Sequence, residues 1–197
     1  MQRRVEIVSK NRVFSKAIFK IDEVKLRHTL YNGQMSREIT RLALDRGDAV
    51  AALVHDRDSD TLLFVEQFRY ATYEKGPGWL FEVPAGMIDP GETPEAALVR
   101  EIHEEIGYAP RIEDLKFIAC FYLSPGGTSE RIYLYFTPVS GLIKLSEGGG
   151  MASEGEDIRK LMIKADEAMR RLDAGEIVDA KTIIALQWYR LHQSRKP

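Results

Sequence analysis

The sequence predicts an α/β protein, because strand patterns and helix patterns both recur along its 197 residues. Residues 49–56 (AVAALVHD) form an apolar run typical of a buried strand. Residues 94–106 carry an apolar stripe of helical period, with Thr93 as a predicted N-cap and Gly107 as a predicted C-terminal stop. Residues 179–196 repeat the helical pattern. These propensities support the α/β class and do not choose among its architectures.

The N-terminal segment predicts an antiparallel β appendage. Apolar residues follow a strand-like pattern from Val5 to Leu30. Asn32-Gly33 is a strong hairpin signal between two strand-like segments, because both residues tolerate the positive φ of a tight turn. We therefore expect a β appendage over residues 1–45 and a main domain over residues 46–197.

Further strand patterns follow in the main domain, at residues 61–71, 79–86, 115–123 and 131–139. Residues 73–78 contain Gly-Pro-Gly and predict a loop. Residues 140–157 are Gly-rich and show no periodicity, and a long segment of this kind in a compact domain is usually functional or disordered. A strand from Ile158 and a helix ending near Gly175 are expected next.

The predicted helix at 94–106 carries a cluster of acidic residues. Glu101 and Glu105 are four residues apart and share one face, with Glu104 beside them. Like charges at this spacing repel, and a hard divalent cation such as Mg²⁺, which prefers carboxylate oxygen, relieves the repulsion. The alternative interpretation is an ordinary solvated acidic face. The cluster alone does not decide between the two.

The composition restricts the class of function. A formal net charge of −2 gives no reason to expect nucleic acid as a partner. No apolar run approaches the roughly 18 residues that a membrane span requires, so no membrane partner is expected. Cys120 is the single cysteine, which precludes an internal disulfide and suits a reducing cytoplasm. Its setting, FIACFYL, predicts a buried small side chain.

The stretch from Gly86 to Tyr108 resembles the Nudix box. That pattern is a Gly, five residues, a Glu, seven residues, then Arg-Glu-aliphatic-x-Glu-Glu-x-Gly-aliphatic. Tyr108 stands at the final position, which is usually aliphatic. The resemblance implies the Nudix fold, an α/β/α sandwich with a mixed sheet. The other fixed positions are filled without a gap by Gly86, Glu92, Arg100, Glu101, Ile102, Glu104, Glu105 and Gly107.

The resemblance also implies a metal-dependent hydrolase, with Mg²⁺ as the cofactor and Mn²⁺ as a substitute. Glu101 and Glu105 are the expected metal ligands and catalytic residues. Glu104 is expected to assist them, and Ala85 to supply a backbone carbonyl oxygen. The residues expected to brace the loop–helix–loop around the site are Gly86, Glu92 and Arg100.

A second acidic cluster lies in the long loop, in the segment SEGEDIR (residues 153–159). By composition alone it is a solvated loop. It resembles the catalytic loop of ADP-ribose pyrophosphatases of the Nudix superfamily. On that match Glu156 completes the metal site and Glu154 is the general base that deprotonates the attacking water. The glycines at 148–150 are expected to let the loop close over substrate.

Substrate contacts are implied by three further matches to ADP-ribose pyrophosphatases. Arg69 matches a position that meets the phosphates; the alternative is a surface arginine at a strand end. Residues 124–131 (SPGGTSER) match a loop near the terminal ribose, where Ser124 and Glu130 are the expected contacts; the alternative is a plain Pro- and Gly-rich turn. Residues 24–41 resemble the N-terminal region that builds a homodimer in that family.

In that family the N-terminal region of one subunit contributes to the nucleotide site of the other. Arg41 matches a residue that contacts the adenine from the partner subunit. Phe19 is the nearest aromatic residue for stacking, whereas Ile18 occupies the other expected aromatic position. This departure leaves the base specificity open.

The sequence therefore predicts a cytoplasmic homodimeric hydrolase of nucleotide-sugars. The expected reaction is hydrolysis of ADP-ribose to AMP and ribose 5-phosphate. One alternative is a pyrophosphatase of GDP-mannose or another nucleotide-sugar. A less favoured alternative is a Nudix-fold regulator that binds a nucleotide without cleaving it; such proteins commonly lose box carboxylates that this chain keeps.

Overall fold

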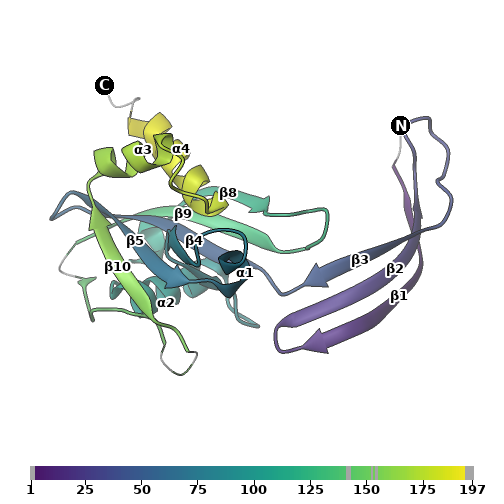
Figure 1. Cartoon of the computed structure of the whole chain (residues 1–197), viewed down its shortest axis with the longest axis horizontal. Helices are drawn as coiled ribbons and strands as arrows, with labels where there is room; N and C mark the ends of the chain where they lie inside the picture. The colour runs from purple at the N-terminus through teal and green to yellow at the C-terminus, as the bar shows by residue number, and fades with distance from the viewer. Residues whose placement is uncertain (1–2, 141–142, 152, 154, 194–197) are drawn as a thin grey trace. The chain divides into compact units, whose positions relative to one another are not determined.

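A computed structural model describes residues 3–140, 143–151, 153 and 155–193 (Figure 1). The chain divides into two compact units. The first contains the N-terminal residues up to Gly47 together with Tyr122–Arg131. The second contains Asp48–Phe121 and the chain from Ile132 onward.

The first unit is built on an antiparallel sheet, so the predicted β appendage is confirmed. Its strands are β1 (Val5–Lys16), β2 (Phe19–His28) and β3 (Ile39–Asp45), in the order β1-β2-β3. Gly33 has a φ of 89°, as the hairpin signal at Asn32-Gly33 predicts for the connection between β2 and β3. Many apolar side chains of this sheet are exposed rather than packed in a core.

The segment from Tyr122 to Arg131 belongs to this unit because its backbone bonds to β3. The N–H of Leu44 donates to the carbonyl of Gly127 over 2.8 Å, and the N–H of Ser129 donates to the carbonyl of Leu44 over 3.0 Å. The expected substrate loop therefore forms a backbone bridge with the last strand of the appendage.

The second unit contains a seven-stranded sheet, which is mixed because β4 pairs parallel with β9 and antiparallel with β5 and β7. The main strand order is β10-β5-β4-β9-β8, with β6 beside β5 and β7 beside β4. The strands are β4 (Ala49–Asp56), β5 (Thr61–Phe68), β6 (Trp79–Glu82), β7 (Ala85–Met87), β8 (Lys116–Tyr122), β9 (Arg131–Val139) and β10 (Ile158–Ile163). The helices are α1 (Tyr70–Tyr73), α2 (Pro94–Ile106), the 3-10 turn η1 (Ile112–Asp114), α3 (Ala165–Asp173) and α4 (Ala180–Gln193).

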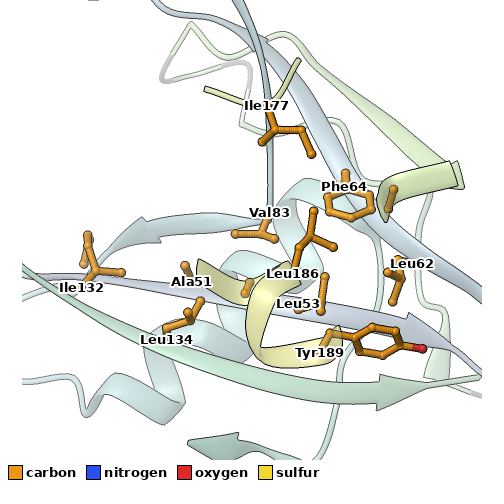
Figure 2. Close-up of a cluster of buried hydrophobic side chains, with 13 residues drawn as sticks. Ala51, Leu53, Leu62, Phe64, Val83, Ile132, Leu134, Ile177, Leu186 and Tyr189 are labelled. Carbon is orange, nitrogen blue, oxygen red and sulfur yellow. The ribbon is translucent and has the colours of Figure 1, made fainter. Parts of the chain in front are cut away.

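Helices cover both faces of this sheet, which confirms the predicted α/β fold. Alternate residues of β4 point to opposite faces, as a strand requires. Ala51 and Leu53 belong to a buried cluster with Leu186 of α4 (Figure 2). Val50, Ala52 and Val54 belong to a second cluster that contains the buried face of α2. The central strand is thus buried on both sides, and this explains its continuous apolar run.

Two local features differ from the sequence prediction. The strand expected over residues 61–71 ends at Phe68, and the chain then forms the short helix α1. The prediction that Cys120 is buried is wrong: it is exposed. It lies on β8, an edge strand of the sheet, where both faces are only partly covered. Among the described helices, none combines the length and hydropathy that a membrane crossing requires.

Candidate active site

Helix α2 carries the predicted carboxylates, and its ends form as the sequence predicts. The hydroxyl of Thr93 accepts a hydrogen bond from the N–H of Ala96 over 3.2 Å, and Pro94 opens the first turn. Gly107 ends the helix with a φ of 84°, in the left-handed region that favours glycine. The buried apolar side chains of α2 pack on the sheet. This packing fixes the rotation of the helix and hence the direction of its glutamates.

Strand β7 passes directly against two of these glutamates. A Cβ atom at Gly86 would lie 1.8 Å from Cδ of Glu101, so only glycine permits this approach. The N–H of Ala85 donates to Oε2 of Glu105 over 3.0 Å. The structure therefore brings Ala85, Gly86, Glu101 and Glu105 together, as the box pattern requires.

Arg100 connects the other acidic residues of the box. Its guanidinium donates two hydrogen bonds to Glu92, over 3.1 and 3.0 Å, and one to the carbonyl of Met87 over 3.0 Å. It also bonds Glu101 and Glu104, over 2.8 and 3.1 Å. Arg100 thus links the turn before α2 to the helix itself, and the bracing role of Arg100 and Glu92 stays a prediction.

The loop that carries Glu156 is fastened to the C-terminal end of α2. The N–H groups of Gly149 and Gly150 donate to the carbonyls of Glu105 and Glu104 over 2.9 and 3.0 Å. A Cβ atom at Gly148 would lie 2.4 Å from the carbonyl oxygen of Glu105. We expected these glycines to give a closing loop its freedom. In the structure they allow a close docking of the loop on the helix instead.

Lys160 on β10 reinforces the same junction. Its ammonium donates to the carbonyl of Ile106 over 3.1 Å and to the carbonyl of Glu147 over 2.9 Å. These bonds satisfy a carbonyl at the helix end and join it to the loop. Glu156 itself accepts a hydrogen bond from the N–H of Met151 over 3.0 Å. Glu154, the predicted general base, lies outside the described residues.

Burial and mutual repulsion make the central carboxylates hold protons unusually strongly. Burial raises the pKa of Glu101 to about 7; Arg100 opposes this rise, and the charges of Glu104 and Glu156 add to it. Burial raises the pKa of Glu105 to about 8. The hydrogen bond from Ala85 opposes this rise, and the charges of Glu101 and Glu156 add to it. A cation placed here would stabilise the charged form of both carboxylates and so lower both pKa values.

The donor chemistry of this cluster suits a hard divalent cation, since all the side chains offer carboxylate oxygens. The described residues contain no group of three His, Cys, Asp or Glu side chains already arranged around a common metal position. Hydrogen bonds within the site explain this in part, because Glu101 and Glu104 are held by Arg100, Glu105 by Ala85 and Glu156 by Met151. A bound cation would compete with these partners.

Arg69 follows the end of β5 and lies within electrostatic range of Glu105 and Glu156. It pairs with Glu82, from Nε to Oε1 over 2.8 Å. Sequence reasoning missed Glu82, although a glutamate inside the apolar run WLFEVPAG is a signal for a paired buried charge. It is only 2% exposed.

The other predicted substrate residues lie in the first unit. Glu130 is buried, and its carboxylate faces the guanidinium of Arg46 at 3.7 Å. The guanidinium carbon of Arg46 also lies 6.0 Å from the centre of the Phe19 ring. The structure therefore gathers Phe19 and Glu130 around Arg46, which sequence reasoning missed. Arg41 on β3 is exposed, and its guanidinium bonds the carbonyl of Thr40 over 2.9 Å.

Ser124 has a structural role in the same loop. Its carbonyl accepts hydrogen bonds from the N–H groups of Gly127 and Thr128, over 3.1 and 3.0 Å. These bonds close the turn that the Pro- and Gly-rich sequence predicts. Its expected contact with substrate stays a prediction.

The chain is similar to known proteins over most of its length. The family model for the NUDIX domain matches residues 45–193. The ADP-ribose pyrophosphatase of Escherichia coli (strain K12) is 38% identical over 189 residues, which cover 95% of this chain and 88% of that protein. The GDP-mannose pyrophosphatase of Enterobacter sp. (strain 638) is 32% identical over 193 residues, which cover 97% of each chain.

A solved structure described as an ADP compounds hydrolase has the same fold. It superposes with a TM-score of 0.72 over 97% of this chain and 95% of its own, at 21% sequence identity. The box geometry, the family model and the relatives agree. The chain belongs to the Nudix hydrolase family.

Proposed function

We propose that this protein hydrolyses the pyrophosphate bond of a nucleoside diphosphate linked to a sugar. ADP-ribose is the preferred substrate in this proposal, and AMP and ribose 5-phosphate are the products. The observation that carries it is the pair Glu101 and Glu105, two carboxylates of raised pKa set against the backbone of β7. The name of the Escherichia coli relative supports the choice of ADP-ribose.

The residues of the box fit a divalent metal, and Nudix hydrolases generally use one. We propose Mg²⁺, with Mn²⁺ as a substitute. Glu101, Glu105 and Glu156 would hold it, with Glu104 and the carbonyl of Ala85 as further donors. Such a cation neutralises phosphate charge and makes water more acidic.

The protein residues have separate tasks in this proposal. The carboxylate of Glu154 takes the proton from the attacking water, the water oxygen bonds to a phosphorus atom, and the phosphoanhydride bond breaks. Arg69 donates hydrogen bonds to the phosphate oxygens, for which a planar guanidinium is suited. Phe19, Arg41, Ser124 and Glu130 contact the nucleoside or the sugar.

A GDP-mannose pyrophosphatase is the second candidate, because the Enterobacter relative has that name and aligns with 97% of each chain. The two activities share the box and differ in the base and sugar contacts. A regulator that binds without cleaving is disfavoured by the complete set of box carboxylates. We also propose that the protein is cytoplasmic and forms a homodimer. The apolar side chains exposed on the first unit, such as Val5, Ile7 and Val13, support the homodimer.

A substrate panel tests the proposal. The protein is incubated with Mg²⁺ and ADP-ribose, GDP-mannose, NADH or a diadenosine polyphosphate, and the products are separated by chromatography. We expect fastest cleavage of ADP-ribose, loss of activity in Glu101→Gln, and full activity in the control Glu176→Gln, which alters an exposed glutamate. Faster cleavage of GDP-mannose favours the second candidate. Failure to cleave any of them overturns the proposed reaction.

A further inference from the structure

A chain of buried charged groups connects Arg69 to the C-terminal helix. Glu82, at the end of β6, accepts two hydrogen bonds from Arg69: Nε donates to Oε1 over 2.8 Å and the second terminal nitrogen donates to Oε2 over 3.2 Å. The side chain of Glu82 is 3% exposed, whereas that of Arg69 is 38% exposed. One edge of the guanidinium is therefore fixed in the protein, and part of the side chain remains accessible.

Lys181 brings a second positive charge to the same carboxylate from α4. Its ammonium donates to Oε2 of Glu82 and, over 2.9 Å, to Oδ1 of Asp179. Asp179 also accepts hydrogen bonds from the N–H and the hydroxyl of Thr182, over 3.0 and 2.6 Å. The hydroxyl of Thr182 accepts one from the N–H of Val83 over 2.8 Å. These bonds tie the start of α4 to the end of β6.

The pattern of bonds has two consequences for Arg69. A bidentate pair sets the plane of a guanidinium, which a single bond does not. An arginine has five N–H donors, and the pair with Glu82 uses two of them. Without Lys181, the negative charge of Glu82 would also cancel the positive charge of Arg69. Lys181 shares that carboxylate, so the guanidinium keeps more of its positive potential.

The charges of Glu105 and Glu156 also act on Arg69, so its remaining donors lie near the carboxylates of the site already described. We infer that Glu82 and Lys181 are positioning residues that aim the Arg69 guanidinium at the phosphates of the substrate. This inference rests on the proposed function. It gives α4, which is distant in sequence from the box, a part in substrate binding.

A double-mutant cycle on the full-length protein tests this role. KM and kcat for ADP-ribose with Mg²⁺ are measured in wild type, Arg69→Gln, Glu82→Gln and the double variant. Loss of charged hydrogen bonds to substrate should raise KM about tenfold in each single variant with little change in kcat. If Glu82 acts through Arg69, the double variant has the KM of Arg69→Gln. Effects that multiply overturn the inference, because they show independent roles.

A matched control is Glu66→Gln, which breaks the pair between Glu66 on β5 and Arg159 on β10 (2.7 Å). Its KM should equal that of wild type. If Glu82→Gln fails to fold, Lys181→Gln takes its place in the cycle, with an expected rise in KM of about threefold that disappears in the Arg69→Gln background.

Failure of the inference and failure of the proposed function give different results. If wild type cleaves ADP-ribose and Arg69→Gln raises KM while Glu82→Gln and Lys181→Gln do not, only the positioning role is overturned. An unchanged KM in Arg69→Gln also overturns it. If wild type cleaves no nucleotide-sugar, the proposed function fails, and the positioning role fails with it.

Discussion

The box (Gly86–Tyr108) and the β appendage (β1 to β3) differ in which side chains they bury and which they leave exposed. In the box, a short continuous stretch buries carboxylates, caps its own helix and bonds nearly every charged group to a neighbour. In the appendage, apolar side chains such as Ile7 (58% exposed) and Val13 (55% exposed) remain at the surface. The charged groups of the box find their partners within one chain, whereas the appendage leaves an apolar surface exposed that is available for contact with another chain. The contrast suggests that bond cleavage and substrate choice depend on different regions.

The largest effect should come from Glu105→Gln. Metal-assisted charge stabilisation is worth several kcal/mol, so kcat should fall about 10³-fold. The folded protein should lose little stability, because Glu105, with a pKa of about 8, is mostly protonated at neutral pH and glutamine resembles the protonated acid. Steady-state kinetics and thermal unfolding measure the two quantities. Retained activity would contradict the importance of the box carboxylates.

The next largest effect should come from Gly86→Ala. The added Cβ atom meets the carboxylate of Glu101, which must move. Overpacking of this kind destabilises by about 1–3 kcal/mol, and we expect kcat to fall about 10²-fold because ligand geometry is lost. Gly76→Ala is the control, since its Cβ atom would have no contact closer than 3.8 Å. Equal behaviour of the two variants would show that the close approach at Gly86 has no catalytic importance.

A smaller effect is expected in the appendage from Ile7→Lys. A charge on the apolar surface should weaken self-association, measured by analytical ultracentrifugation. If the partner supplies Arg41, KM for ADP-ribose should rise about tenfold while the affinity for Mg²⁺ stays constant. Glu6→Lys places the same side chain on the adjacent residue, which points to the other face of the strand. A dimeric Ile7→Lys protein with wild-type KM would argue against a shared site.

The smallest effect concerns pH. The pKa values of Glu101 and Glu105, about 7 and about 8, exceed their ordinary value of 4.5, so the folded state binds these protons more strongly than the unfolded chain. The resulting stability is fully present below the unfolded pKa and is lost as pH rises through the folded values. With EDTA present, Tm should therefore fall as the pH rises from about 4.5 to about 8, and less so in Glu105→Gln. An equal fall of Tm in wild type and in Glu105→Gln would show that other groups cause the pH dependence.

The sequence was most informative where function needs neighbours along the chain. The cap at Thr93, the stop at Gly107 and the common face of Glu101 and Glu105 follow from local spacing, and the structure has each of them. Local sequence patterns do not reveal contacts between residues that are distant in sequence. Lys181 meets Glu82 across 99 positions, and this contact depends on the packing of α4.

Two other differences have physical causes. The glycine-rich composition of residues 148–150 predicts freedom for a loop, because composition does not reveal that the N–H groups of Gly149 and Gly150 bond the end of α2. Cys120 was expected to be buried because its neighbours are apolar. An edge strand such as β8 has only one neighbouring strand, so apolar residues there are covered incompletely.

The most direct test is calorimetric titration of Mg²⁺ into the protein at neutral pH, in buffers of different ionisation enthalpy. Wild type and Ile7→Lys should bind with equal affinity and release protons, because the cation displaces them from Glu101 and Glu105. Glu105→Gln should bind at least about tenfold more weakly and release fewer protons. Equal affinity and equal proton release in Glu105→Gln would contradict the account, because the metal would then be held outside the box.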